Sequence, residues 1–158
     1  MTTRPLSILV LAACLGALVS AFTAQYVFGL QPCNLCLIQR VPFALAALLA
    51  AAALAAGPRS SGILLTLAGA LLVANGAIAV YHVGVEQHWW ASLVCSGGDV
   101  AAIDVADLAA QMSRPAEVSC DRPQWSFHGI TMAGLNVVYS TGLGALTLLL
   151  GRRMGGMA

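Results

Sequence analysis

The sequence predicts an all-α fold in which four transmembrane helices form one bundle. Hydrophobic residues make up 59% of the chain, and charged residues make up only 8%. Globular proteins carry about 25% charged residues, so too few charges remain here to cover a water-exposed surface. Four apolar runs follow one another, whereas an Ala-rich soluble bundle would need polar stripes along each helix. The chain 1–158 is therefore interpreted as a single integral-membrane domain, and its lack of Lys argues against nucleic-acid binding.

The four spans are expected at about residues 6–28, 37–56, 62–85 and 130–150. A helix needs about 20 residues to cross the hydrocarbon core, and the first, third and fourth runs reach that length. The first run also resembles a signal peptide, with Arg4 before it, but it is long for one and is expected to be retained. The second run is long enough only if its helix starts near residue 37, with Pro42 in its first turn and Arg40 reaching the interface.

Basic residues dominate one side of the expected spans. Four Arg and no acidic residue lie there: Arg4, Arg59, Arg152 and Arg153. The other side holds all six acidic residues and the remaining three Arg. Because Arg-rich segments stay in the cytoplasm, both termini are expected there. The cysteine pairs Cys33/Cys36 and Cys95/Cys120 then face the opposite, oxidising side, where thiols form disulfides.

The outer loop at about residues 86–129 is the only long polar segment. Within it, residues 99–112 are Ala-rich and place Asp104, Asp107 and Gln111 at helical spacing on one face. This pattern predicts a short amphipathic helix lying flat on the outer surface of the membrane. Three Trp near the ends of the loop are typical of the aromatic belt at lipid headgroups: Trp89, Trp90 and Trp125.

The Cys33-Asn34-Leu35-Cys36 motif comes directly before the second run. A purely structural disulfide here would constrain almost no loop, and a metal site would need two further ligands. A redox-active Cys33–Cys36 disulfide is favoured, because the positive end of a helix stabilises a thiolate on the second cysteine. Arg40 follows Cys36 by about one helical turn, so it could add positive charge beside the sulfur or simply reach the headgroups.

The second pair, Cys95 and Cys120, lies in the polar outer loop. A disulfide between them could pin the loop, or it could be an exchangeable bond, since Ser96 and Gly97 suggest access from water. His82, near the end of the third run, could face water at the interface or a cavity inside the bundle, where ionisable residues in spans usually lie.

Three further residues inside the runs are given packing roles. Asn75 and Asn136 are expected to join helices by hydrogen bonds. Cys14 is expected to pack as a small apolar residue.

Together these features resemble the DsbB family of bacterial disulfide bond formation proteins. The resemblance rests on four spans and on motifs that are found together: Pro32-Cys33-Asn34-Leu35-Cys36 with Gln39-Arg40, the pair Cys95/Cys120, and Trp125-Xaa-Phe127-Xaa-Gly129. It covers nearly the whole chain, although the segment around His82 is only loosely similar.

The resemblance implies a protein-dithiol:quinone oxidoreductase of the bacterial inner membrane, with both cysteine pairs in the periplasm. A reduced DsbA-like periplasmic thiol oxidase would exchange with the Cys95–Cys120 disulfide and form its mixed disulfide with Cys95. Electrons would pass from Cys95/Cys120 to Cys33/Cys36 and from Cys36 to a quinone.

The quinone, ubiquinone or menaquinone, is expected beside Arg40 and, by family position, beside His82. One alternative is an enzyme like vitamin K epoxide reductase, which also joins four spans to a Cys-Xaa-Xaa-Cys motif but carries it in a late helix. An alternative of another class is a non-catalytic membrane scaffold whose four outer cysteines bind Zn²⁺.

Overall fold

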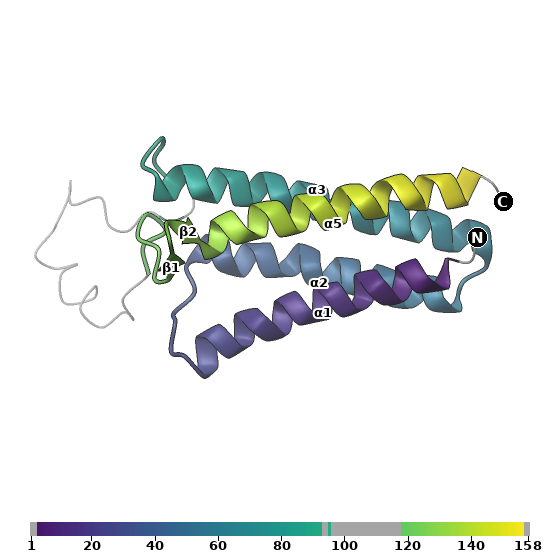
Figure 1. Cartoon of the computed structure of the whole chain (residues 1–158), viewed down its shortest axis with the longest axis horizontal. Coiled ribbons are helices and arrows are strands. Elements are labelled where there is room, and N and C mark those ends of the chain that lie inside the picture. Colours follow the sequence, from purple (N-terminus) through teal and green to yellow (C-terminus); the bar gives the residue numbers. More distant parts are fainter. Residues whose placement is uncertain (1–2, 93–94, 96–117, 157–158) are drawn as a thin grey trace, which may run out of the picture.

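Four long helices make up most of the described chain (Figure 1). The computed structural model describes residues 3–92, 95 and 118–156. Its helices and strands are α1 (Arg4–Tyr26), α2 (Asn34–Ala55), α3 (Pro58–Glu86), β1 (Ser126–Phe127), β2 (Ile130–Thr131) and α5 (Met132–Gly156). All four helices are long and apolar enough to cross a membrane. The prediction of an all-α bundle of four transmembrane helices is therefore confirmed, whereas the amphipathic helix predicted at 99–112 lies outside the described residues.

The two ends of the bundle differ. Both chain termini lie at one end, and β1 and β2 form a short antiparallel hairpin at the other (Figure 1). The end with the hairpin is called the cysteine end, because Cys33 at the start of α2 lies there. Arg59 and Arg152 belong to the opposite end, since α3 starts and α5 finishes there.

Helix α2 begins three residues earlier than the sequence suggested. Cys33 has an extended backbone (φ −76°, ψ 169°), and its Sγ accepts a hydrogen bond from the Cys36 N–H at 3.4 Å. It thus acts as an N-cap by satisfying one of the N–H groups that a helix start leaves without a partner.

The expectation that Pro42 lies in the first turn of α2 was wrong, because the helix starts at Asn34 and Pro42 falls inside it. A proline has no N–H group, so the Ile38 carbonyl loses its α-helical partner. That loss lies in the third turn of α2, between the cysteine motif and the Ala-rich half of the helix.

Helices α3 and α5 pack closely because glycines lie along their contact. A Cβ placed on Gly144 would come within 2.7 Å of the Val73 backbone nitrogen, and one on Gly151 within 2.8 Å of the Thr66 backbone nitrogen. Both positions therefore bring the two backbones nearer than any side chain would permit. Small residues at helix contacts are the usual way in which transmembrane helices associate.

Helix α1 packs mainly on α2 and leaves a space towards α5. A core of buried side chains fills the part of the bundle away from the cysteine end, including Val10, Cys14, Ala50 and Leu72. Cys14 is fully buried there, as its expected packing role requires. Towards the cysteine end, α1 diverges from the other helices (Figure 1).

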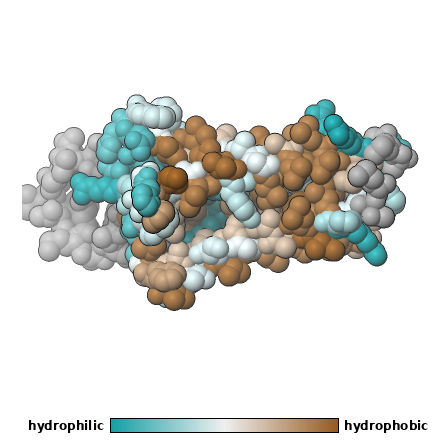
Figure 2. Space-filling model, viewed as in Figure 1, coloured by the Kyte–Doolittle hydropathy of each residue, from teal (hydrophilic) through white to brown (hydrophobic). Residues whose placement is uncertain are grey.

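Hydrophobic side chains cover most of the middle of the molecule, and hydrophilic ones gather at its two ends (Figure 2). Large apolar side chains are exposed on different helices along this belt, such as Val19 (63% exposed), Leu48 (67%) and Val138 (75%). A water-soluble protein rarely exposes so large a continuous apolar surface, whereas the sides of a transmembrane bundle face lipid.

Candidate active site

Four cysteines gather at the cysteine end of the bundle. Cys33 and Cys36 are thiols in this structure, and their sulfurs lie 2.9 Å apart. Cys95 and Cys120 form a disulfide. Leu35 and Val85 pack with them in one buried cluster. Segments far apart in the sequence therefore converge on a single group of sulfur atoms.

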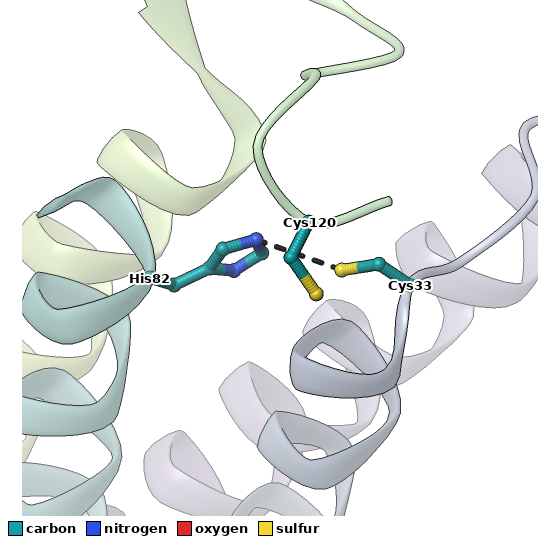
Figure 3. A group of neighbouring side chains, drawn as sticks. All are labelled: Cys33, His82 and Cys120. Carbon is teal, nitrogen blue, oxygen red and sulfur yellow. Dashed lines mark hydrogen bonds between the residues drawn. The ribbon is translucent and has the colours of Figure 1, made fainter. Parts of the chain in front are cut away.

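The two pairs meet through Cys33 and Cys120. The sulfurs of these residues and a ring nitrogen of His82 lie within 4.8 Å of one another, and all three residues are buried. Figure 3 shows the three side chains pointing towards one another from α2, α3 and the segment before β1. Because Cys120 is 2% exposed and packs against Cys33, the disulfide presents its Cys120 sulfur to the first pair.

Burial and hydrogen bonding act on the Cys33 thiol. The Cys36 sulfur, which hydrogen-bonds to it, and burial together raise the pKa of the Cys33 thiol well above its usual range. Cys33 is therefore held as a neutral thiol in this arrangement, because the hydrogen bonds from the backbone N–H groups of Cys36 and Leu35 lower its pKa by less.

His82 lies inside the site rather than in water at the interface. It is 3% exposed, and its Nε2 lies 3.5 Å from Cys33 Sγ (Figure 3). The same nitrogen lies 3.9 Å from Glu86 Oε1, one helical turn further along α3. On its other side, Nδ1 lies 3.5 Å from Gln39 Nε2. His82 thus links the cysteine motif to polar groups deeper in the bundle.

Glu86 is a site residue that the sequence reading missed, because it was counted with the acidic residues of the outer loop. It is the last residue of α3 and only 9% exposed. Its Oε2 accepts a hydrogen bond of 2.6 Å from the Thr131 hydroxyl in β2. The spacing of four residues from His82 could have revealed it, since such residues share one helix face.

Gln39 was also missed as a site residue. It is 6% exposed, and its Oε1 accepts a hydrogen bond of 2.8 Å from Asn136 Nδ2 in α5. Asn136 and Asn75 join helices as expected, since Asn75 in α3 donates to Ser140 in α5 at 2.9 Å. The available signal for Gln39 was an amide in an apolar run, because a buried amide requires partners.

Arg40 is held by α1 rather than extended freely to the interface. Its Nη1 donates to Gln25 Oε1 at 2.7 Å, and its guanidinium lies 4.8 Å from the centre of the Phe22 ring. Both contacts keep the positive charge beside the first turns of α2, on the wall of the cavity described next.

A cavity of about 650 Å³ adjoins the sulfur cluster. Small or apolar residues of α1 and α5 form much of its wall, and its polar lining includes Gln39, Arg40, His82 and Glu86. Near it, the Tyr139 hydroxyl of α5 reaches across to donate to the Ala13 carbonyl of α1 at 2.9 Å. A largely apolar cavity with a few polar groups at one end is typical of a site for an apolar molecule with a polar head.

The sulfur cluster does not fit a structural zinc site in this form. Such a site takes four ligands, usually thiolates or imidazoles. The sulfurs of Cys95 and Cys120 are bonded to each other, so neither is available as a thiolate. The geometry instead suits exchange between a dithiol and a neighbouring disulfide, which needs sulfur atoms close together.

The profile of the family described as "Disulfide bond formation protein DsbB" matches residues 3–150. The chain belongs to the DsbB family. This membership confirms the resemblance noted from the sequence motifs and removes the case for a vitamin K epoxide reductase-like enzyme.

Several curated members of the DsbB family are similar to it. "Disulfide bond formation protein B" of Azoarcus sp. (strain BH72) is 30% identical over 159 residues, covering 96% of this chain and 95% of that protein. The protein of the same name from Chromobacterium violaceum is 34% identical over 169 residues, covering 98% and 97%. "Disulfide bond formation protein B 2" of Pseudomonas syringae pv. syringae is 27% identical, covering 92% and 86%. No solved structure matches the chain.

Family and fold together define the protein class. This DsbB-family chain is a multi-pass membrane protein and an oxidoreductase of disulfide bond formation. Its described part contains a disulfide, Cys95–Cys120, as such a protein requires.

Proposed function

We propose that this chain is a protein-dithiol:quinone oxidoreductase that regenerates the disulfide of a DsbA-like periplasmic thiol oxidase. The observation that carries the proposal is the close approach of Cys33 Sγ and Cys120 Sγ, within 4.8 Å in a buried cluster. A sulfur from each pair is thereby in position for exchange. Electrons pass from Cys95/Cys120 to Cys33/Cys36, which in the oxidised enzyme form a disulfide, and then to the quinone.

The first exchange opens the second pair. A thiolate of the reduced partner attacks Cys95 Sγ, a mixed disulfide forms, the Cys95–Cys120 bond breaks, and Cys120 leaves as a thiolate. Two observations support this assignment: Cys120 is 2% exposed, and it is Cys120 that packs against Cys33. Cys95 is the less buried sulfur and suits contact with a partner protein.

The second exchange carries the electron pair inward. The Cys120 thiolate attacks Cys33 Sγ of the Cys33–Cys36 disulfide, a Cys33–Cys120 bond forms, and Cys36 leaves as a thiolate. Cys36 lies in the first turn of α2, where the helix N-terminus favours negative charge, and it lines the cavity.

The cavity fits a quinone by its size and lining. A bound ubiquinone or menaquinone supplies the electron sink, taking up two electrons and two protons to leave as a quinol. The apolar residues of α1 and α5 suit its tail and ring. Arg40, held by Gln25, presents a positive donor to a carbonyl oxygen, and His82 and Glu86 lie on the same wall.

We place the protein in the bacterial inner membrane with both termini in the cytoplasm and the cysteine end in the periplasm. Both termini lie at the end of the bundle that carries Arg59 and Arg152. This distribution of Arg agrees with the retention of positive charge in the cytoplasm. The periplasm is also the side on which disulfides persist.

The direct test mixes the purified full-length protein anaerobically with a reduced thioredoxin-fold dithiol protein and a quinone. The wild type should turn over while the quinone absorbance changes. Cys36→Ser should reduce turnover to background, because it removes the cavity-lining sulfur that is proposed to pass electrons to the quinone. Cys14→Ser, which alters a buried thiol in the helix core, is the matched control and should remain active. Full turnover by Cys36→Ser would overturn the proposed relay.

A further inference from the structure

A continuous chain of hydrogen bonds runs from the middle of the bundle to the buried cysteines. Asn75 Nδ2 donates to Ser140 Oγ at 2.9 Å, and Ser140 Oγ donates to Asn136 Oδ1 at 2.6 Å. Asn136 Nδ2 donates to Gln39 Oε1 at 2.8 Å, and Gln39 Nε2 lies 3.5 Å from His82 Nδ1. The first three of these hydrogen bonds donate in the same direction, towards Gln39.

The donor-to-acceptor direction of these hydrogen bonds decides which ring nitrogen of His82 carries the proton. Asn136 occupies the Gln39 oxygen, so the Gln39 amide faces Nδ1 with an N–H group. A neutral imidazole has one N–H and one acceptor nitrogen. With Nδ1 as the acceptor, the proton lies on Nε2, which is 3.5 Å from Cys33 Sγ.

We propose that this series of hydrogen bonds holds His82 in the Nε2–H tautomer, so that the ring donates a hydrogen bond to the Cys33 sulfur. Gln39 and Asn136 are then positioning residues for thiol–disulfide exchange, acting through His82. The inference rests on the proposed relay for its role in turnover, whereas the tautomer itself follows from the hydrogen bonds alone.

The His82 Nε2–H group would act when the Cys33–Cys120 disulfide breaks. The second thiolate of the partner breaks the mixed disulfide, the partner leaves in oxidised form, and Cys95 is released as a thiolate that attacks Cys120 Sγ. A Cys95–Cys120 bond forms, the Cys33–Cys120 bond breaks, and its electron pair leaves on Cys33 Sγ. Cys33 is 6% exposed, so water stabilises that charge poorly. The His82 Nε2–H and the Cys36 backbone N–H reach the sulfur at 3.5 and 3.4 Å, and the Leu35 backbone N–H also hydrogen-bonds to it.

Glu86 is the competing partner for the His82 proton. Its Oε1 lies 3.9 Å from Nε2, which is too far for a hydrogen bond to oxygen, whereas sulfur accepts at longer distances. Its other oxygen is already bonded to Thr131 at 2.6 Å. Among the described residues, the thiol of Cys36 also faces Cys33, whereas Cys120 is in a disulfide. The geometry therefore favours donation to the Cys33 sulfur.

The tautomer can be read directly by nitrogen NMR of ¹⁵N-histidine in the full-length protein, held in lipid nanodiscs without quinone. The chain has three histidines, and His88→Asn with His128→Asn leaves only His82. Asn suits both positions because their φ angles are 58° and 50°, a region that Asn tolerates. We expect the proton on Nε2, and a proton on Nδ1 would overturn the proposal whether or not the protein turns over quinone.

Variants of Gln39 test what sets the tautomer. An ionised Gln39→Glu side chain can only accept, so it should move the proton to Nδ1. Gln39→Leu removes the N–H group and should leave a mixture of both tautomers. Thr147→Val is the control, because Thr147 is a fully buried polar residue of α5 whose hydroxyl donates to the Leu143 carbonyl and takes no part in this hydrogen-bond chain. It should keep Nε2–H. An unchanged tautomer in both Gln39 variants would remove its positioning role.

The effect on Cys33 is measured by the pH dependence of its alkylation in a Cys36→Ala background. Gln39→Leu should move the midpoint upward by about one pH unit, because the thiolate loses part of its donor. Thr147→Val should not move it. If the tautomer changes while the midpoint of the alkylation curve stays the same, His82 does not donate a hydrogen bond to the Cys33 sulfur. That result would overturn the proposal but not the electron relay.

Discussion

The positive charge of Arg40 is fixed by two residues of α1, Gln25 and Phe22. A long side chain held in this way presents its guanidinium in one place, which suits recognition of a carbonyl oxygen. The sequence placed Arg40 beside Cys36 by helical spacing, but it left open whether the side chain reached the headgroups. Only the contacts across to α1 decide this, and spacing along one helix cannot show them.

Arg40→Ala should raise the apparent KM for quinone by about 10-fold or more, because hydrogen bonds to charged groups contribute about 1.5–3 kcal/mol. The KM for the thiol partner should change little, since Arg40 lines the cavity and is held by Gln25 and Phe22 of α1. Steady-state kinetics with each substrate varied in turn measure both values. Arg59→Ala, at the opposite end of the bundle, is the matched control. Equal effects on both KM values would contradict the assigned contact.

Asp121, next to the buried Cys120, gives a pH-dependent contribution to folding. The Ser119 hydroxyl donates to its carboxylate and lowers the pKa of Asp121. A carboxyl group with a lowered pKa stabilises the folded state at pH values above its ordinary pKa of about 4. This contribution is lost as the pH falls through the lowered pKa.

Ser119→Ala should therefore raise the pKa of Asp121 towards that ordinary value. Carboxyl-carbon NMR during an acid titration measures the change. Ser126→Ala is the control, since Ser126 lies in the nearby strand β1. The idea fails if the titration of Asp121 is the same in all three proteins.

The polar residues of the site show what sequence reasoning could reach. The cysteines could be identified because their chemistry and spacing are distinctive. Gln39 and Glu86 carried weaker signals, an amide in an apolar run and a spacing of four residues from His82. The groups that hold the two side chains in place lie on other elements, Asn136 in α5 and Thr131 in β2. A side chain's partners across the bundle depend on how the helices rotate against each other, which no single run encodes.

Among the helices, α3 and α5 form the closest pair. Gly144 lies against the α3 backbone, whereas a Cβ on Gly142 would meet nothing within 4 Å. These two positions on one helix separate the effect of helix contact from the effect of replacing glycine.

Gly144→Leu should lower the free energy of unfolding by about 1–3 kcal/mol or more, because the larger side chain forces the two backbones apart. Gly142→Leu, facing open space, should cost little. Unfolding in mixed detergent micelles, followed by circular dichroism, compares the two variants. Similar losses at both positions would show that the α3–α5 contact is not held by close packing.

At the scale of the bundle, the composition and the four apolar runs were sufficient to predict the fold class, because only helices satisfy their own backbone hydrogen bonds in lipid. The start of α2 was misplaced because Cys33 supplies its own N-cap, a role more usual for Ser, Thr, Asp or Asn. The divergence of α1 from α5 was not predicted, since the sequence of an apolar run does not show which helices pack together and which separate.

The cavity can be narrowed without disturbing the cysteines. Gly16 of α1 lines it, and a Cβ at this position would meet nothing within 4 Å. Gly16→Leu should therefore fold normally but raise the apparent KM for quinone several-fold while leaving that for the thiol partner unchanged. Gly142→Leu places the same side chain outside the cavity and serves as the control. Normal quinone kinetics in Gly16→Leu would exclude this cavity as the quinone site.

The space between α1 and α5 would let the proposed quinone reach the cavity by diffusing within the membrane. The proposed partner oxidase would approach from water, in three dimensions, whereas a molecule entering between these helices would arrive along the plane of the bilayer. Its effective concentration is then its mole fraction in the lipid around the protein. Adding empty lipid at constant total quinone should slow the enzyme at subsaturating quinone, although nothing in the aqueous phase has changed.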